Sequence, residues 1–142
     1  LAKMRAKQNR DVKGNFAKMK GRLLWPTEGE IIRKFGTIRN PESGVTTENV
    51  GIDIKVNKEA SVKSVLDGVV STITYIRGHG NIIIIDHGEG FSTVYAQVEN
   101  IVVNENDYIQ MGNTIAKTTN ILHFEVWGNQ KKQNPEQWLI KK

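Results

Sequence analysis

The chain has 142 residues, a formal net charge of +5 and no cysteine. This length suits one domain with a substantial core and is short for two. The absence of cysteine excludes disulfides, thiolate zinc sites and a cysteine nucleophile. The longest apolar run, residues 82–85, is far too short to span a bilayer. No secretory signal is visible and the chain starts at Leu1, so we expect a fragment of a longer protein.

The positive charge is concentrated at the N-terminus. Residues 1–22 contain eight Lys or Arg and one acid, whereas residues 23–142 contain twelve Lys or Arg and fourteen acids. A domain that reads nucleic acid more often carries its basic residues on the folded face that makes the contact. We therefore expect no nucleic-acid partner and interpret the basic run as a solvated helix face.

Residues 1–22 are predicted to form a basic helical segment. Val12, Phe16, Met19 and Leu23 recur at helical spacing and give one apolar stripe. Gly21 is a plausible end of the helix. The first residues of the segment are interpreted as the tail of a longer upstream helix.

From Leu24 onward the pattern is β. Trp25-Pro26 ends the helix, and short β-rich runs alternate with glycine-containing turns. The predicted fold class is mainly β, an antiparallel sandwich or barrel-like sheet with an N-terminal helix. Residues 82–85 are apolar at every position, which favours a strand covered on both faces. The polar stretch between Gly36 and Asn49 is predicted to be a loop, either the wall of a site or plain surface.

Three histidines are candidates for chemistry. His79 and His87 adjoin glycines in predicted turns, and a turn role is the simplest interpretation of both. His123 lies in a strand-like run and is followed by Glu125. Asp53 also lies inside a β run, where an unpaired buried carboxylate would be costly. These residues leave open a metal site, a packed structural histidine, and carboxylates that are paired or face solvent.

Six stretches of the chain form an ordered set: L-L-W-P-T-E-G-E-I-I-R-K-F-G, N-V-G-I-D-I, V-L-D-G-V-V, G-N-I-I-I-I-D-H-G-E-G-F-S-T-V-Y-A-Q, I-L-H-F-E-V-W and N-P-E-Q-W-L. Together they resemble the lysostaphin-type (LytM-like) zinc peptidase domain and follow that family's order over about residues 23–139. The combination is far more specific than any single stretch. The resemblance implies a LytM fold over residues 23–142 and a relation to enzymes that cut peptide cross-links in the bacterial cell wall.

The resemblance also implies that the catalytic apparatus is incomplete. The family uses His-x-Gly-x-Asp for two zinc ligands, Tyr-x-His for a catalytic histidine, and His-x-His for a catalytic histidine followed by the third ligand. Asn49 stands at the first ligand position, whereas Asp53 and His123 keep the other two. Gln97 and Ile121 stand where the family has its catalytic histidines. A catalytic zinc needs three protein ligands, and no imidazole remains at either position for proton transfer or oxyanion stabilisation.

The other two histidines are not expected to compensate. The resemblance places His79 and His87 in turns away from the cleft. We therefore expect no catalytic residue, no bound metal and no cofactor. The run 117–120 is shorter than the loop that usually precedes His-x-His, so we expect a remodelled groove.

The subgroup most similar to this chain is the murein hydrolase activators of the EnvC type. F-A-K-M-K-G-R-L-L-W-P, residues 16–26, is similar to their passage from a coiled coil into a degenerate peptidase domain. This implies a non-catalytic protein that binds and switches on a peptidoglycan amidase during cell division or envelope remodelling. The implied location is the periplasm or extracytoplasmic envelope of a bacterium, with the upstream coiled coil in contact with a membrane division complex.

The groove expected to bind the partner is the former active site. Its expected residues are Asn49, Asp53, Tyr95, Gln97, Ile121 and His123. Two alternatives remain open: a residual zinc-dependent peptidoglycan endopeptidase, and a plain peptidoglycan-binding module.

Overall fold

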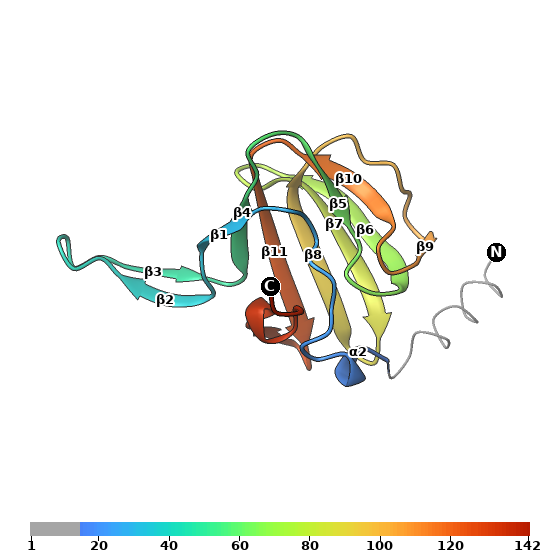
Figure 1. Cartoon of the computed structure of the whole chain (residues 1–142), viewed down its shortest axis with the longest axis horizontal. Helices are drawn as coiled ribbons and strands as arrows, with labels where there is room; N and C mark the ends of the chain where they lie inside the picture. Colours follow the sequence, from blue (N-terminus) through green and yellow to red (C-terminus); the bar gives the residue numbers. More distant parts are fainter. Residues whose placement is uncertain (1–14) are drawn as a thin grey trace.

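The computed structural model describes residues 15–142 and consists mainly of antiparallel β-strands (Figure 1). The large sheet has the order β1-β4-β11-β8-β7-β6-β9, and β12 pairs with β11. Its strands are β1 (Glu30–Arg33), β4 (Ile52–Lys55), β11 (Ile121–Gly128), β8 (Phe91–Val98), β7 (Gly80–Gly88), β6 (Gly68–Ile76), β9 (Tyr108–Ile109) and β12 (Lys131–Gln133). Two small sheets pair β5 (Ala60–Lys63) with β10 (Thr114–Thr118) and β2 (Gly36–Arg39) with β3 (Thr46–Asn49). The predicted antiparallel, mainly β class is confirmed.

The core lies between the large sheet and the β5–β10 pair. Strand β11 shows why the sequence folds this way, because its burial alternates with a period of two. Leu122, Phe124 and Val126 are fully buried and join Val62 of β5 and Ile115 of β10 in one cluster. The alternate residues of β11 lie on the outer face of the sheet.

The apolar run 82–85 divides between the two faces of the sheet. Ile83 and Ile85 belong to the main core, whereas Ile82 joins a smaller outer cluster with Val94 and Ala96 of β8. Half-buried Ile84 packs against this second cluster. Residues on both faces of this strand are therefore packed against other side chains, as predicted, but the cluster on the outer face is smaller than the main core.

The predicted loop between Gly36 and Asn49 is instead a β-hairpin that projects from the body of the domain (Figure 1). Ile38 and its threonine-rich partner strand favour extended backbone. At the tip, the Asn40 Oδ1 atom accepts a hydrogen bond of 2.9 Å from the backbone N–H of Glu42, and the Asn40 carbonyl accepts one of 2.8 Å from Gly44. The loop prediction failed because polar composition concealed both the strand residues and this asparagine-based turn.

The prediction of a helix over residues 1–22 is wrong for residues 19–22, which the structure describes as non-helical. Residues 1–14, including the expected upstream helix, lie outside the described residues. The α2 helix (Asn15–Lys18) is a single turn, and the backbone N–H groups of Gly21 and Leu23 then donate to the carbonyl of Trp138, at 3.0 and 3.1 Å. Residues 21–23 therefore pair with the C-terminal segment and do not continue the helix. Within residues 15–142, no helix has the length and apolarity needed to cross a membrane.

Candidate functional site

The candidate site is a cleft on the outer face of the sheet. The register of β4 and β11 places Asp53 directly opposite His123, and Asn49 ends β3 beside them. The cleft has a volume of about 390 Å³. Its lining residues are Ile32, Arg33, Glu48, Asn49, Val50, Asp53, Gly78, His79, Gln97, Ile121, His123 and Glu125.

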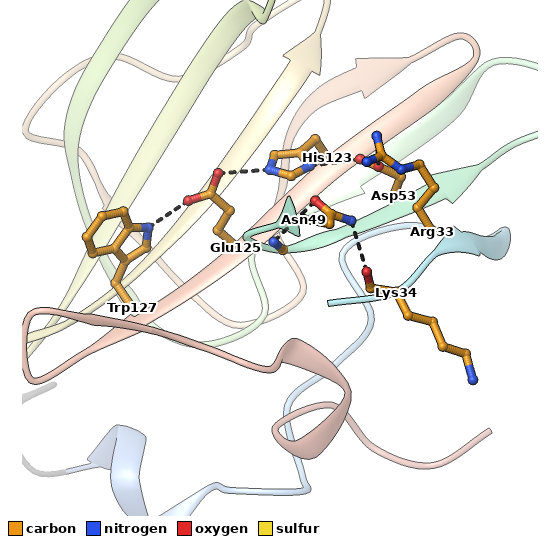
Figure 2. A network of polar contacts seen from close by, with 8 residues as sticks. Arg33, Lys34, Asn49, Asp53, His123, Glu125 and Trp127 are labelled. Carbon is orange, nitrogen blue, oxygen red and sulfur yellow. Dashed lines mark hydrogen bonds and ion pairs between the residues drawn. The ribbon is translucent and has the colours of Figure 1, made fainter. Parts of the chain in front are cut away.

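A continuous chain of polar contacts crosses the floor of this cleft (Figure 2). The His123 Nδ1 atom lies 2.7 Å from Asp53 Oδ1, and the Nε2 atom lies 2.8 Å from Glu125 Oε2. The indole Nε1–H of Trp127 donates to Glu125 Oε1 at 2.8 Å, and Arg33 Nη1 lies 3.5 Å from Asp53 Oδ2. We call these five residues, Arg33, Asp53, His123, Glu125 and Trp127, the cleft network.

The geometry of the cleft network favours a protonated histidine. An ionised carboxylate can only accept hydrogen bonds, so both ring nitrogens of His123 act as donors. Burial alone would lower the pKa of His123, but the hydrogen bonds and charges of Glu125 and Asp53 outweigh it, and the pKa is raised. Burial likewise favours a higher pKa for Glu125, but the hydrogen bonds from His123 and Trp127 and the nearby positive charge lower it. The network therefore places the His123 imidazolium between two carboxylates, and Asp53 also faces the guanidinium of Arg33.

Both polar groups of the Asn49 side chain also form hydrogen bonds within the chain. Its side chain is buried, its Nδ2 donates to the carbonyl of Lys34 at 3.2 Å, and its Oδ1 accepts from the backbone N–H of Gly51 at 3.4 Å. The amide thus fixes the junction between the projecting hairpin and β4. It offers no imidazole lone pair at this position.

These contacts do not fit a zinc ion at the positions that the resemblance indicates. A histidine ligand must present a neutral nitrogen lone pair, and both nitrogens of His123 face carboxylate oxygens. Asn49 is a poor replacement for imidazole. Among the described residues, no group of three or more His, Asp or Glu side chains is arranged to hold a metal ion.

The two residues at the positions where the resemblance implies catalytic histidines also line a second, adjoining cleft. Gln97 and Ile121 line both this cleft, of about 300 Å³, and the first one. Gln97 forms a bulge in the pairing of β7 with β8, and its φ is +65°. Its backbone N–H donates to the carbonyl of His79 at 3.1 Å. The two clefts therefore form one groove, and exposed Tyr75 continues it on β6.

The structure corrects the expected positions of three residues. Tyr95 does not line the groove, because it is fully buried on the core face of β8. His79 lies in a turn as predicted, but it lines the cleft instead of lying away from it. His87 is not a turn residue: it is a buried residue of β7, whose Nδ1 lies 2.7 Å from the carbonyl of Asp67. Burial lowers the pKa of His87 to about 4 despite that hydrogen bond.

Tyr95 and His87 meet in the core instead. The Thr93 Oγ1 atom lies 2.8 Å from both His87 Nε2 and Tyr95 Oη, and the backbone N–H of Val65 donates to Tyr95 Oη at 3.2 Å. Burial raises the pKa of Tyr95, although its hydrogen bonds oppose the shift. These hydrogen bonds satisfy the buried polar groups of β7 and β8 and are separate from the groove.

Sequence reasoning missed Glu125 and Trp127 as site residues. Both follow His123 at intervals of two along β11, so the period of a strand places them on the same face. That signal was available in the sequence. Arg33 carried no such signal, because an irregular register between β1 and β4 brings it opposite Asp53.

Three comparisons with known proteins bear on this site. The model for peptidase family M23 matches residues 47–135. The chain is 35% identical over 122 residues to the murein hydrolase activator NlpD of Escherichia coli (strain K12), covering 81% of this chain and 30% of that protein. It is 23% identical over 133 residues to the murein hydrolase activator EnvC of the same organism, covering 89% and 31%. The chain thus spans about a third of the length of these curated relatives.

The fold is similar to that of a solved zinc-containing peptidase from Vibrio cholerae. The TM-score is 0.73 at 23% identity, over 85% of this chain and 41% of that one. This similarity concerns the fold alone.

Proposed function

Because the chain belongs to peptidase family M23, we propose that its groove binds a protein partner and has lost peptide hydrolysis. The observation that carries this proposal is the closed cleft network. His123, a ligand position of the family, has both nitrogens within 2.8 Å of carboxylate oxygens of its own chain. Neither Gln97 nor Ile121 can take up a proton during hydrolysis. The residual peptidase is therefore the weaker alternative.

The partner that we propose is a peptidoglycan amidase. Two relatives carry the name murein hydrolase activator, which supports a hydrolase partner for this chain. The resemblance described above adds the amidase and the link to cell division or envelope remodelling. It also supports action in the periplasm, with an upstream coiled coil that contacts a membrane division complex.

Activation requires that the domain prefer one state of its partner. An activator shifts a closed–open equilibrium only by its difference in affinity for the two states. A shift from about 1:99 to 99:1 requires roughly 5.5 kcal/mol of preference. The groove offers apolar surface for such binding, since Ile32 and Tyr75 are 48% and 68% exposed and Ile121 lies between the two clefts. A partner helix with an apolar face would suit this surface.

The proposal is tested by placing a charge in the groove. The Ile121→Asp variant is expected to lose activation of an amidase from the same genome, measured as release of labelled fragments from purified sacculi. The matched control is Val102→Asp, because Val102 is 67% exposed and lines neither cleft. A folded Ile121→Asp variant that activates normally would exclude the groove as the binding site.

Two further measurements separate the alternatives. Muropeptide cleavage by the purified chain alone, with stoichiometric zinc, would support the residual endopeptidase. Retention on sacculi without any effect on an amidase would support a plain peptidoglycan-binding module.

A further inference from the structure

The two ends of the described chain meet at one end of the large sheet. The backbone N–H of Ile140 donates to the carbonyl of Leu23 at 2.8 Å, and the Trp25 indole N–H donates to the carbonyl of Ile140 at 2.7 Å. Figure 1 shows α2 and the C-terminal turn at the lower end of the sheet. Ile121 of the groove begins β11, whereas Trp127 lies at its other end. We call residues 15–25 together with residues 129–142 the terminal face.

The terminal face is strongly basic, and the rest of the described domain is acidic. Residues 15–25 contain Lys18, Lys20 and Arg22 and no acid. Residues 129–142 contain four lysines and one acid, so the face carries a net charge of +6. Residues 26–128 contain eight basic and thirteen acidic residues, a net of −5. Folding therefore places two basic segments, distant in sequence, side by side.

All three tryptophans of the chain pack against lysines of this face. The Nζ atom of Lys142 lies 4.3 Å from the ring centroid of Trp25, and that of Lys132 lies 4.9 Å from Trp127. Lys20 lies 5.4 Å from the ring of buried Trp138. In the described part of the chain, none of the seven cations of the face has a carboxylate within ion-pair distance. The Nζ atom of Lys142 also donates to the carbonyl of Gly29 at 2.7 Å. The positive charge of the face is thus not neutralised by any described carboxylate.

We propose that the terminal face docks on the anionic phospholipid headgroups of a bilayer surface. Clusters of basic residues are attracted to anionic leaflets. Half-buried Trp25 and Trp127, the aliphatic stems of the lysines above them and exposed Ile140 add the amphipathic contacts that a headgroup layer accepts. A polyanion such as DNA would use the charges alone. The acidic remainder of the domain would be repelled by the same leaflet, so docking would leave the groove facing away from the membrane.

The test measures binding of the whole chain to vesicles of phosphatidylcholine with and without phosphatidylglycerol. Binding is expected only with phosphatidylglycerol and is expected to weaken as salt is added. Because all three tryptophans pack against lysines of the terminal face, docking is expected to shift the intrinsic emission to shorter wavelength. The Lys131→Gln/Lys132→Gln variant is expected to bind about thirtyfold more weakly, at roughly 1 kcal/mol for each basic residue near the surface. Lys141→Gln/Lys142→Gln, at the end of the same C-terminal segment, is expected to weaken binding to the same extent.

The matched control is Lys58→Gln/Arg77→Gln, which removes the same charge from exposed positions outside the terminal face. It is expected to bind the vesicles like the unmodified chain. Three outcomes would overturn the proposal: no binding to phosphatidylglycerol vesicles, equal weakening by the control, or capture by double-stranded DNA or sacculi without vesicle binding. Circular dichroism of each variant establishes that the comparison is between folded proteins. The outcome is independent of the proposed amidase activation, because no vesicle measurement involves the groove.

Discussion

Removal of the Glu125 carboxylate should destabilise the domain through the cleft network. In Glu125→Ala, the His123 Nε2–H and the Trp127 Nε1–H both lose their acceptor, which lies 2.8 Å from each in the native chain. The side chains of His123 and Glu125 are 15% and 14% exposed, so water replaces these contacts only in part. Loss of two charge-assisted bonds at such a position should cost about 2–3 kcal/mol. A shift in the melting temperature of roughly 6–12 °C should follow for a domain of this size.

The loss in Glu125→Ala should also depend on pH in a defined direction. The pKa of His123 is raised, so its contribution is fully present below the unfolded value of 6.5 and is lost as pH rises through the raised pKa. The pKa of Glu125 is lowered, so its contribution is present above the ordinary value of 4.5 and is lost as pH falls through the lowered pKa. The difference in unfolding free energy between the native chain and Glu125→Ala should therefore be largest between these two ordinary values and should shrink on either side.

Urea unfolding of both chains across this pH range measures the effect directly. Glu125→Gln is the matched control, because its amide oxygen can still accept from Trp127 while its amide group can donate to a neutral His123. Its loss should be smaller than that of Glu125→Ala and should depend less on pH. Equal stability of Glu125→Ala and the native chain near pH 6 would refute the cleft network as a stabilising element.

Other parts of the structure give three further predictions. The pKa of His87, about 4, lies below its unfolded value of 6.5, so stability should fall by about 3 kcal/mol as pH drops through this interval; His87→Asn should flatten this dependence in urea titrations. Phe16→Ala should cost about 3–5 kcal/mol in chemical denaturation, because Phe16 is 1% exposed and stacks 4.8 Å from Phe91. Asn49→His/Glu125→Ala should bind zinc more tightly than the native chain in calorimetric titration, because it supplies an imidazole and removes the carboxylate that contacts His123 Nε2. Equal zinc affinity would refute the claim that the cleft network blocks metal binding. That variant should still not hydrolyse muropeptides, because Gln97 remains.

Much of the fold could be predicted because its core follows the period of two. The buried residues Leu122, Phe124 and Val126 alternate with the outer residues of β11 and identify the strand and its core face. The projecting hairpin was missed because Ile38 is the single large apolar residue of β2. A two-stranded ribbon also has no buried face that would require apolar and polar residues to alternate. Cross-strand contacts and a turn determine its pairing, and these leave only a weak signal in the pattern of apolar and polar residues along the sequence.

The candidate site was predictable where one strand carried the information and unpredictable where several strands met. Tyr95 and Gln97 would share a face in a regular strand, but the bulge at Gln97 breaks that alternation and leaves Tyr95 in the core. His79 reaches the cleft because the β6–β7 turn adjoins the end of β8, where its carbonyl accepts from Gln97. Both outcomes depend on register between strands, which one sequence does not specify locally.

The separation of the two faces of the sheet explains how the site could change without loss of the fold. Ile121 and His123 lie on the outer face of β11, whereas its core residues on the alternate positions are fully buried and need no outer partner. Loss of a metal ion would nevertheless leave the carboxylates of Asp53 and Glu125 close together and without compensating charge, which is unfavourable in a partly buried cleft. The positive charge that a metal would supply is here provided by the imidazolium of His123 and the guanidinium of Arg33. These ion pairs balance the charges of the four side chains at the floor of the groove, which supports the proposal that the groove binds a protein partner in place of a metal ion.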